Sequence, residues 1–334
     1  MIVTLTPNPS LDRTLQLAQL VRGAVNRAGS AQVDPGGKGV NVSRALGKHG
    51  ITTVAVLPLG GPDGSVLADL LARKGIKVRR VPVAGNTRTN ITVAEPDGTT
   101  TKLNEPGPLL SAPEVAALAA AVLDAAVPGC WVVGCGSVPL GVPDDFYAGL
   151  IGPLHARGAR VAVDSSGAAL RAVLDPGPGR PLPDLVKPNL AELSEAAGRP
   201  LRTLGEVVGA ARELLTRGVG TVLASLGADG AVLVTPEGAL YGGARAECLR
   251  STVGAGDALL AGYLSEVAEH PVADPGGDSH PAPDPRALST ALAWGAAAAG
   301  LAGSRMPTPA DVAAIRVTLH DHLDPGRCLE GEPR

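Results

Sequence analysis

Short apolar, β-branched runs recur along the chain and alternate with longer stretches whose apolar positions have helical spacing. Apolar runs of roughly four to eight residues are typical of buried strands. They predict strands over residues 1–6, 52–60, 130–137, 159–167, 184–189 and 220–227. The helical spacing predicts helices over residues 42–50, 65–75, 112–126, 146–158 and 204–218. This alternation favours an α/β fold of three layers, α/β/α, with a mostly parallel central sheet.

Two more polar segments interrupt this rhythm, at about residues 10–33 and 86–104. The second has the pattern of a hairpin that turns at Asp97-Gly98. We expect both segments to form a small antiparallel lid beside the main sheet. Residues 1–323, with these lid segments included, are expected to form a single domain that has a Pro- and Gly-rich surface loop over 270–286, followed by a flexible tail over 324–334.

The composition limits the kinds of partner that the chain can bind. Of its 334 residues, 45% are hydrophobic, which is enough for a substantial core. The net charge is only -3 and aromatic residues make up 2% of the chain. A chain of this kind has no global field for nucleic acid or an anionic membrane, and few rings on which bases could stack. Any phosphate that it binds must therefore be held locally.

The sequence carries no sign of export, membrane insertion or a structural metal. The first residues lack a basic and apolar leader, and no uncharged apolar run approaches the ~18 residues of a membrane span. The four cysteines do not have the spacing of metal ligands, which indicates free thiols in a reducing compartment. We expect a cytoplasmic protein.

The segment STVGAGDALLAG, residues 251–262, combines a glycine turn with a lone acid at the start of a predicted helix. Free N–H groups at a helix N-terminus favour an anion, so Gly254, Ala255 and Gly256 are candidates for a phosphate site. Asp257 directly behind them is a candidate general base. The alternative is an aspartate that only caps its own helix.

The segment DPGGKGVNVSRALG, residues 34–47, places paired glycines before another predicted helix. Gly36 and Gly37 would let a ligand approach the backbone closely, while Lys38 and Asn41 supply directional donors. The segment lacks the P-loop pattern. A glycine turn followed by an ordinary amphipathic helix explains it equally well.

The polar lid segments carry an acid and several cations. Asp12 could hydrogen-bond paired hydroxyls of a sugar, although an Asx turn is the alternative. The cations are Arg27, Arg88 and Lys102. They could donate hydrogen bonds to a phosphate ester, or they could form a solvated basic face.

Two further segments suit a nucleotide and its metal ion. In KPNLAELSEAAG, Asn189 and Glu192 have the spacing both of a helix cap and of a water-mediated Mg²⁺ site. In SLGADGAVLV, Gly227 and Gly230 could cradle a phosphate or form a simple hairpin turn. A phosphate donor, a metal, a base and a polyol pocket together indicate phosphoryl transfer to a sugar hydroxyl.

GGKGVNVSRALG and STVGAGDALLAG resemble the two signature segments of the ribokinase-like (PfkB) carbohydrate kinases, and the likeness runs from about residue 1 to 315. The resemblance implies the ribokinase-like three-layer fold with a β-lid over the sugar. It also implies ATP and Mg²⁺ as cofactors. Asp257 matches the catalytic base and Gly254, Ala255 and Gly256 match the anion hole.

The resemblance assigns further residues to the cofactors. Asn189 and Glu192 match the NxxE element that is tied to Mg²⁺ and phosphate, with Glu192 acting through water. The positions that match the nucleotide site are Lys187, Asn189, Ser225, Gly227, Ala228 and Gly230.

Three segments look like the hexose-phosphate branch of that family: TPNPSLD near the N-terminus, TRTN at 87–90 and TKLNEPG at 101–107. The branch includes 1-phosphofructokinases, tagatose-6-phosphate kinases and a minor 6-phosphofructokinase. Ser251 stands before Thr252 where ribokinases usually have Asp, which fits this branch. The sugar-phosphate contacts that the resemblance implies are Asp12, Gly36, Gly37, Lys38, Asn41, Arg88 and Ser137, with Arg27 and Lys102 from the lid.

The expected reaction is ATP-dependent phosphorylation of fructose 1-phosphate at its 6-hydroxyl. Tagatose 6-phosphate and fructose 6-phosphate are the alternative substrates. A protein of another class, a non-catalytic sugar-phosphate sensor on the same fold, remains the alternative to an enzyme. The family also implies a homodimer formed through the lids.

Overall fold

The structure is a computed structural model that describes residues 1–175, 177–246, 248–269 and 282–330. Most of the predicted surface loop 270–286 lies outside these residues, although Pro285 and Arg286 already belong to a helix. Within the described residues, no helix is both long enough and apolar enough to cross a membrane.

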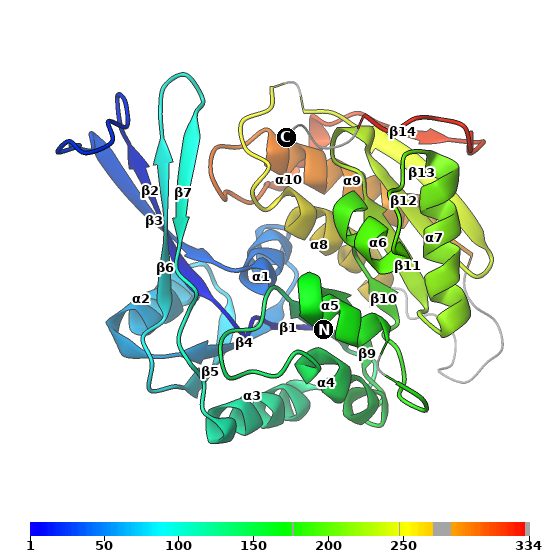
Figure 1. Cartoon of the computed structure of the whole chain (residues 1–334), viewed down its shortest axis with the longest axis horizontal. Coiled ribbons are helices and arrows are strands. Elements are labelled where there is room, and N and C mark those ends of the chain that lie inside the picture. Colours follow the sequence, from blue (N-terminus) through cyan, green and yellow to red (C-terminus); the bar gives the residue numbers. More distant parts are fainter. Residues whose placement is uncertain (176, 247, 270–281, 331–334) are drawn as a thin grey trace.

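A mostly parallel sheet runs through the centre of the molecule (Figure 1). Its parallel strands are, in spatial order, β5 (Lys77–Pro82), β4 (Thr53–Leu59), β1 (Ile2–Leu5), β8 (Trp131–Cys135), β9 (Arg160–Asp164), β10 (Leu185–Val186) and β11 (Thr221–Ser225). Three antiparallel strands continue it at one edge: β12 (Ala231–Thr235), β13 (Gly238–Ala244) and β14 (Val317–His320). Every strand predicted from an apolar run is present, and β5 and the antiparallel edge are additions to the prediction.

Helices cover both faces of this sheet, which gives the predicted three layers. One face carries α1 (Lys38–Lys48), α2 (Gly61–Arg73), α8 (Ala255–Glu269), α9 (Pro285–Ala299) and α10 (Pro309–Ala313). The other carries α3 (Ala112–Ala125), α4 (Phe146–His155), α5 (Gly167–Leu174), α6 (Leu190–Ala197) and α7 (Leu204–Arg217). The faces are set by the alternation along each strand, because successive side chains point to opposite sides.

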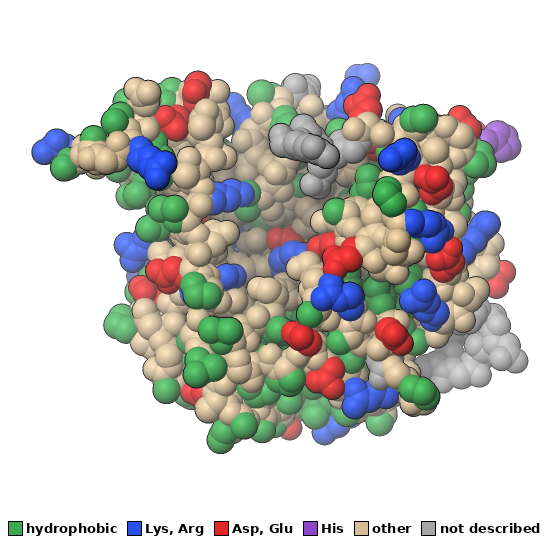
Figure 2. All heavy atoms as spheres, viewed as in Figure 1, with side chains coloured by type: hydrophobic (Ala, Val, Ile, Leu, Met, Phe, Trp, Pro, Cys, Tyr) green, Lys and Arg blue, Asp and Glu red, His purple; other side chains and the backbone are tan. Residues whose placement is uncertain are grey.

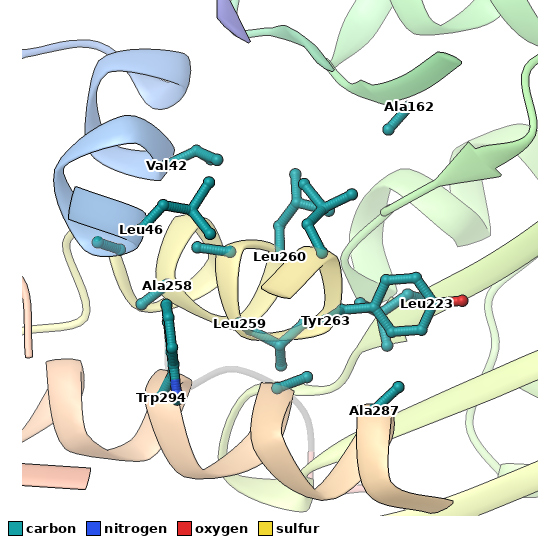
Figure 3. Close-up of a cluster of buried hydrophobic side chains, with 14 of the residues drawn as sticks. Val42, Leu46, Ala162, Leu223, Ala258, Leu259, Leu260, Tyr263, Ala287 and Trp294 are labelled. Carbon is teal, nitrogen blue, oxygen red and sulfur yellow. The ribbon is translucent and has the colours of Figure 1, made fainter. Parts of the chain in front are cut away.

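Helix α8 lies in the middle of the first helical layer, between α1 and α9 (Figure 3). Ala258 and Leu260 are fully buried and share a core cluster with Leu46 of α1 and Trp294 of α9. Each large apolar side chain buried in this way stabilises the fold by ~1.5–3 kcal/mol. The start of α8 is therefore held by the core on both sides.

The predicted lid is a second, separate sheet that stands beside the main body (Figure 1). Its strands are β2 (Ser10–Gln16), β3 (Ser30–Gly36), β6 (Arg88–Ala94) and β7 (Thr100–Asn104), in the order β3-β2-β6-β7. The central pair, β2 and β6, is parallel, so the lid is a mixed sheet and the prediction of an antiparallel lid was wrong in this respect. The hairpin between β6 and β7 turns at Gly98, whose φ of 92° suits glycine.

The C-terminal segment 324–330, which the sequence predicts to be a flexible tail, is bonded to the main body. The N–H groups of Leu204 and Gly205 donate to the carbonyls of Arg327 and Pro325. The N–H of Glu330 donates to Asp229 across 2.8 Å. These backbone bonds explain the order of the segment, because they satisfy N–H groups at the start of α7 that the helix itself leaves free.

Candidate active site

A hollow lies between the lid and the main body, and basic and acidic side chains gather at its floor (Figure 2). The floor is formed where the parallel strands end and where α1 and α8 begin. Ligands of open α/β sheets bind at this edge, because loops and helix N-termini meet there.

Asp257 lies in the first turn of α8 and is only 7% exposed. Its Oδ2 accepts a hydrogen bond from Nδ2 of Asn41 on α1, at 2.9 Å. Burial, with the nearby charge of Asp164, raises the pKa of Asp257 to about 6. A buried carboxylate whose pKa lies near neutrality can take a proton and release it again, as a general base must.

The turn in front of Asp257 is built to expose backbone donors. Gly254 has a φ of 79°, a conformation that glycine adopts at little cost. Ala255 donates its N–H to the carbonyl of Thr252 at 3.3 Å. Among the described residues, no hydrogen bond uses the N–H of Gly256 or Asp257. Two donors thus remain at a helix N-terminus, where the dipole also favours an anion.

Two lysines flank a fully buried carboxylate beside this turn. Asp164, at the end of β9, forms ion pairs with Lys38 Nζ at 2.8 Å and Lys187 Nζ at 3.1 Å. Burial acts to raise the pKa of Asp164, but the two lysines overcome it and hold the pKa below its usual value. Lys187 Nζ also lies 3.4 Å from where a Cβ on Gly256 would stand. Lys187 therefore adjoins the anion site, and Lys38 shares the carboxylate of Asp164 with it.

Asn189 and Glu192 form a capping box at the start of α6. The N–H of Glu192 donates to Asn189 Oδ1, and Glu192 Oε2 accepts from the N–H of Asn189, each at 2.8 Å. The second oxygen, Oε1, lies 3.9 Å from Lys38 Nζ. The cap that the sequence allows is present, and one carboxylate oxygen still faces the site.

The predicted nucleotide residues follow β10 and β11 along the same edge. Ser225 lies beside Asn189 and donates its N–H to the carbonyl of Pro188. Gly227 and Ala228 form a short exposed turn after β11, and Gly230 leads into the antiparallel strand β12. The hairpin turn is thus present, with Gly227 and Ala228 open to solvent.

The strand register gives the lid one polar face. Asp12 on β2 is in register with Asn90 on β6, so both side chains point to the same side. Asp12 accepts from Ser10 Oγ at 2.8 Å and from Asn90 Nδ2 at 3.0 Å, which is a contact between strands rather than an Asx turn. Gly36 passes close by, since a Cβ there would stand 2.2 Å from Asp12.

Arg88 and Lys102 lie on this same face, in register with Ser10 and Thr92. Arg88 donates to the carbonyls of Asn8 and Glu105, each at 3.0 Å, and its buried Nε has no partner among the described residues. Lys102 is exposed and lies further out along the lid.

Two predicted residues, Arg27 and Ser137, form no hydrogen bond or ion pair with the cluster within the described part of the chain. Arg27 is exposed and belongs to the connection between β2 and β3. This connection extends at the outer end of the lid (Figure 1). Ser137 follows β8 at the correct edge of the sheet and is exposed. Gly37, with a φ of 111°, lies between the end of β3 and the start of α1, so it joins the lid to the site.

Among the described residues, no group of three or more His, Cys, Asp or Glu side chains forms a ready metal site. The carboxylate oxygens of Glu192 and Asp164 are nevertheless ligands of the type that Mg²⁺ prefers. Mg²⁺ usually keeps several waters and is held by one or two carboxylates with substrate phosphates. The residues present fit such an ion.

Residues 6–311 match the family model described as pfkB family carbohydrate kinase. The chain belongs to this family. The predicted family and the predicted ribokinase-like three-layer fold are therefore confirmed. The protein is a carbohydrate kinase, a phosphotransferase that acts on a sugar phosphate.

Known members of the pfkB family resemble the chain over most of its length. A 1-phosphofructokinase of Rhodobacter capsulatus is 37% identical over 322 residues, which cover 95% of this chain and 96% of the relative. A 1-phosphofructokinase of Xanthomonas campestris is 39% identical over 268 residues, 80% and 84% of the two chains. The solved structure of phosphofructokinase-2 from Escherichia coli in complex with substrates and products has a TM-score of 0.84 and 33% identity. That match covers 93% of this chain and 97% of the solved one.

Sequence reasoning missed two buried residues of this kinase site, Asp164 and Arg44. Asp164 ends an apolar strand at the ligand-binding edge, and this position was the available signal. Arg44 donates to Asn41 Oδ1 at 2.9 Å, but nothing in its helical spacing distinguishes it from a solvated arginine.

Proposed function

We propose that this kinase transfers the γ-phosphoryl group of ATP to the 6-hydroxyl of fructose 1-phosphate, giving fructose 1,6-bisphosphate. The observation that carries the proposal is the position of Asp257: a buried carboxylate with a pKa of about 6, in the same helical turn as the free N–H donors of Gly256 and Asp257. A protein that only senses sugar phosphates has no use for this pairing of a base and an anion site. The names of the bacterial relatives support the substrate.

In this proposal Asp257 orients the attacking hydroxyl and accepts its proton as the new P–O bond forms. Gly256 and its neighbours donate backbone N–H groups to the transferring phosphoryl group, whose charge spreads over its outer oxygens. Lys187 stands beside these donors, Lys38 shares Asp164 with it, and both lysines add positive charge. Mg²⁺, held by Glu192 through water, would neutralise charge on the ATP phosphates.

The polar face of the lid is proposed to hold the sugar phosphate. Asp12 accepts from sugar hydroxyls, and Arg88 and Lys102 attract the 1-phosphate. The partnerless, buried Nε of Arg88 supports this role, because a buried donor without a partner is costly unless a ligand satisfies it. Closure of the lid would exclude water from the transfer.

A comparison of four substrates tests the proposal. We expect kcat/KM with ATP and Mg²⁺ to be highest for fructose 1-phosphate, when compared with fructose 6-phosphate, tagatose 6-phosphate and ribose. A preference for ribose would contradict the proposed role of the lid cations in binding a sugar phosphate. A preference for either 6-phosphate would keep the mechanism and change the substrate. No turnover with any of the four would favour a sensor.

We also propose that the protein forms a homodimer through its lids. Strands β3 and β7 are the open edges of the lid sheet, and unpaired edges favour pairing with another chain. Exposed apolar side chains accompany them, including Val25 at 80% exposure and Leu103 at 58%.

A further inference from the structure

We propose that Arg44 is a positioning residue that holds the Asn41 amide in the orientation in which it donates to Asp257, and that ties this pair to lid strand β3. The proposal rests on the proposed role of Asp257 as the base.

The side chain of Arg44 lies on α1, one turn after Asn41, and is only 6% exposed. Its Nη1 donates to Asn41 Oδ1 at 2.9 Å and to the carbonyl of Pro35 at 3.0 Å. Its Nη2 lies 3.6 Å from Oδ1 of Asp34. The guanidinium therefore spans two elements, α1 and β3.

The donor and acceptor properties of these groups fix the direction of the chain of hydrogen bonds. A guanidinium has donors only, so the atom of Asn41 that faces Arg44 must be the oxygen. The amide nitrogen then faces the opposite way, toward Asp257, whose ionised carboxylate only accepts. Without Arg44, the Asn41 amide could rotate and present its oxygen to Asp257, which would repel the carboxylate.

The same guanidinium responds to the position of the lid. Asp34 and Pro35 belong to β3, which ends at Gly36, and α1 begins two residues later at Lys38. Asp34 is in register with the proposed sugar-binding residue Asp12. A shift of β3 relative to α1 must lengthen the bonds of Arg44, so a displaced lid would loosen the orientation of Asn41.

Burial of charged groups is costly, and replacing a whole buried ion pair, here Arg44 with Asp34, by apolar residues of similar volume is often neutral or stabilising. A purely structural role would therefore be met as well by a pair of apolar side chains. The specific gain from arginine here is its planar guanidinium, whose Nη1 donates to both Asn41 and Pro35 while its Nη2 faces Asp34.

A double-mutant cycle tests the proposal: Arg44→Met, Asn41→Leu and the double variant, assayed with the hexose phosphate that the wild-type enzyme prefers. We expect Arg44→Met to lower kcat by between ~10- and ~100-fold, the size of loss that misplaced groups cause, with little change in KM for ATP. In the Asn41→Leu background, Arg44→Met should have almost no further effect on kcat, because Arg44 acts through Asn41.

Two outcomes would overturn the proposal. One is that the losses in kcat simply multiply in the double variant. The other is that Arg44→Met lowers the melting temperature while kcat per folded molecule stays normal. Arg79→Met serves as the matched control, because Arg79 is a surface arginine paired with Asp124. It should leave kcat unchanged.

Arg44→Lys separates charge from geometry, because lysine keeps the charge without the planar fork. We expect it to remain slow, and full turnover would also contradict the proposal. A failure of the proposed function would be recognised by a different result. In that case the Asp257→Asn variant would turn over substrate at a near-normal rate, whatever the outcome of the double-mutant cycle.

Discussion

The carboxylate of Asp257 is held in an environment that opposes its charge. It is buried, and the neighbouring Asp164 adds a second negative charge. The amide of Asn41 and the ammonium groups of Lys38 and Lys187 act in the opposite direction. The resulting pKa of about 6 leaves the group ionised at neutral pH and still able to bind a proton.

Asp257→Asn should fold normally and lose most of its activity. Asparagine has nearly the same shape and can still accept from Asn41, but it cannot take a proton. Loss of a general base lowers kcat by ~10²–10⁴-fold. Steady-state kinetics with circular dichroism of the folded variant would check this, and turnover close to wild type would end the assignment of the base.

The same residue should set the acid limb of the pH profile. Below pH 6 we expect kcat to fall, because the folded-state pKa of Asp257 is about 6 and the protonated form cannot act as base. Asp164→Asn removes a negative neighbour, so it should lower the pKa of Asp257 and move the acid limb to lower pH. The phosphate of the substrate titrates identically in both enzymes, so it cannot cause a difference between their acid limbs. An acid limb that does not move would contradict its assignment to Asp257.

Asp257 should also lower stability at neutral pH. The pKa of Asp257 is about 6 in the folded protein, compared with 3.8 for an unperturbed aspartate. Above pH 6 the ionised side chain therefore opposes folding, and well below pH 4, where it is protonated in both states, it has no such effect. Asp257→Asn is therefore expected to raise the free energy of unfolding by ~1–3 kcal/mol at pH 7.5. Urea unfolding should show this gain fading as the pH falls toward 4, and a gain that is constant with pH would contradict the cause.

At the scale of elements, the active turn depends on the backbone of Gly254 more than on its side-chain neighbours. Its φ of 79° costs a residue with a Cβ ~1–2 kcal/mol. A Cβ would also stand 2.6 Å from Met306 Cε, the flexible end of a side chain that can move. The strain therefore falls on the turn that presents the N–H donors.

Gly254→Ala should reduce both stability and kcat, because relief of the strain shifts these donors. Gly50→Ala is the matched control: Gly50 has a φ of 77° with open space around it, just beyond the end of α1. It should lose similar stability by thermal melting and keep its kcat. Equal loss of kcat in both variants would show that strain alone, rather than the turn, explains the effect.

The elements that the sequence predicted are those with a local signal. The six apolar runs became strands, and GAGD became the start of a helix, because their patterns lie within a few neighbouring residues. Helix α5, strand β5 and the antiparallel edge β12–β14 were missed, although β12, with the sequence AVLVT, is itself a short apolar run. The segment 324–330 is polar, and its order comes from backbone bonds to α7 that composition cannot reveal.

The site divides in the same way. Asp257, Asn41 and Lys38 stood in recognisable motifs, and the structure brings them together. Asp164 pairs with Lys38 across 126 positions of sequence, which no local pattern can predict. Arg27 was predicted to contact the sugar phosphate, yet in its own chain it lies in the exposed connection between β2 and β3.

At the scale of the whole molecule, the lid presents open edges and apolar side chains away from the main body. Val25→Glu should therefore shift the protein from dimer to monomer, as measured by light scattering after gel filtration, because a charge opposes burial in an interface. Val127→Glu, at an exposed valine after α3, should leave the assembly unchanged. A monomeric wild-type protein would contradict the proposed dimer.

The packing of α8 between α1 and α9 determines how the enzyme should lose its activity on heating. The turn that carries Asp257 continues directly into the fully buried residues Ala258 and Leu260, so it cannot loosen independently of the core. Hydrogen exchange of the α8 amides should accordingly belong to the slowest class, which opens only by global unfolding. On heating, activity and tertiary structure should disappear over the same temperature range.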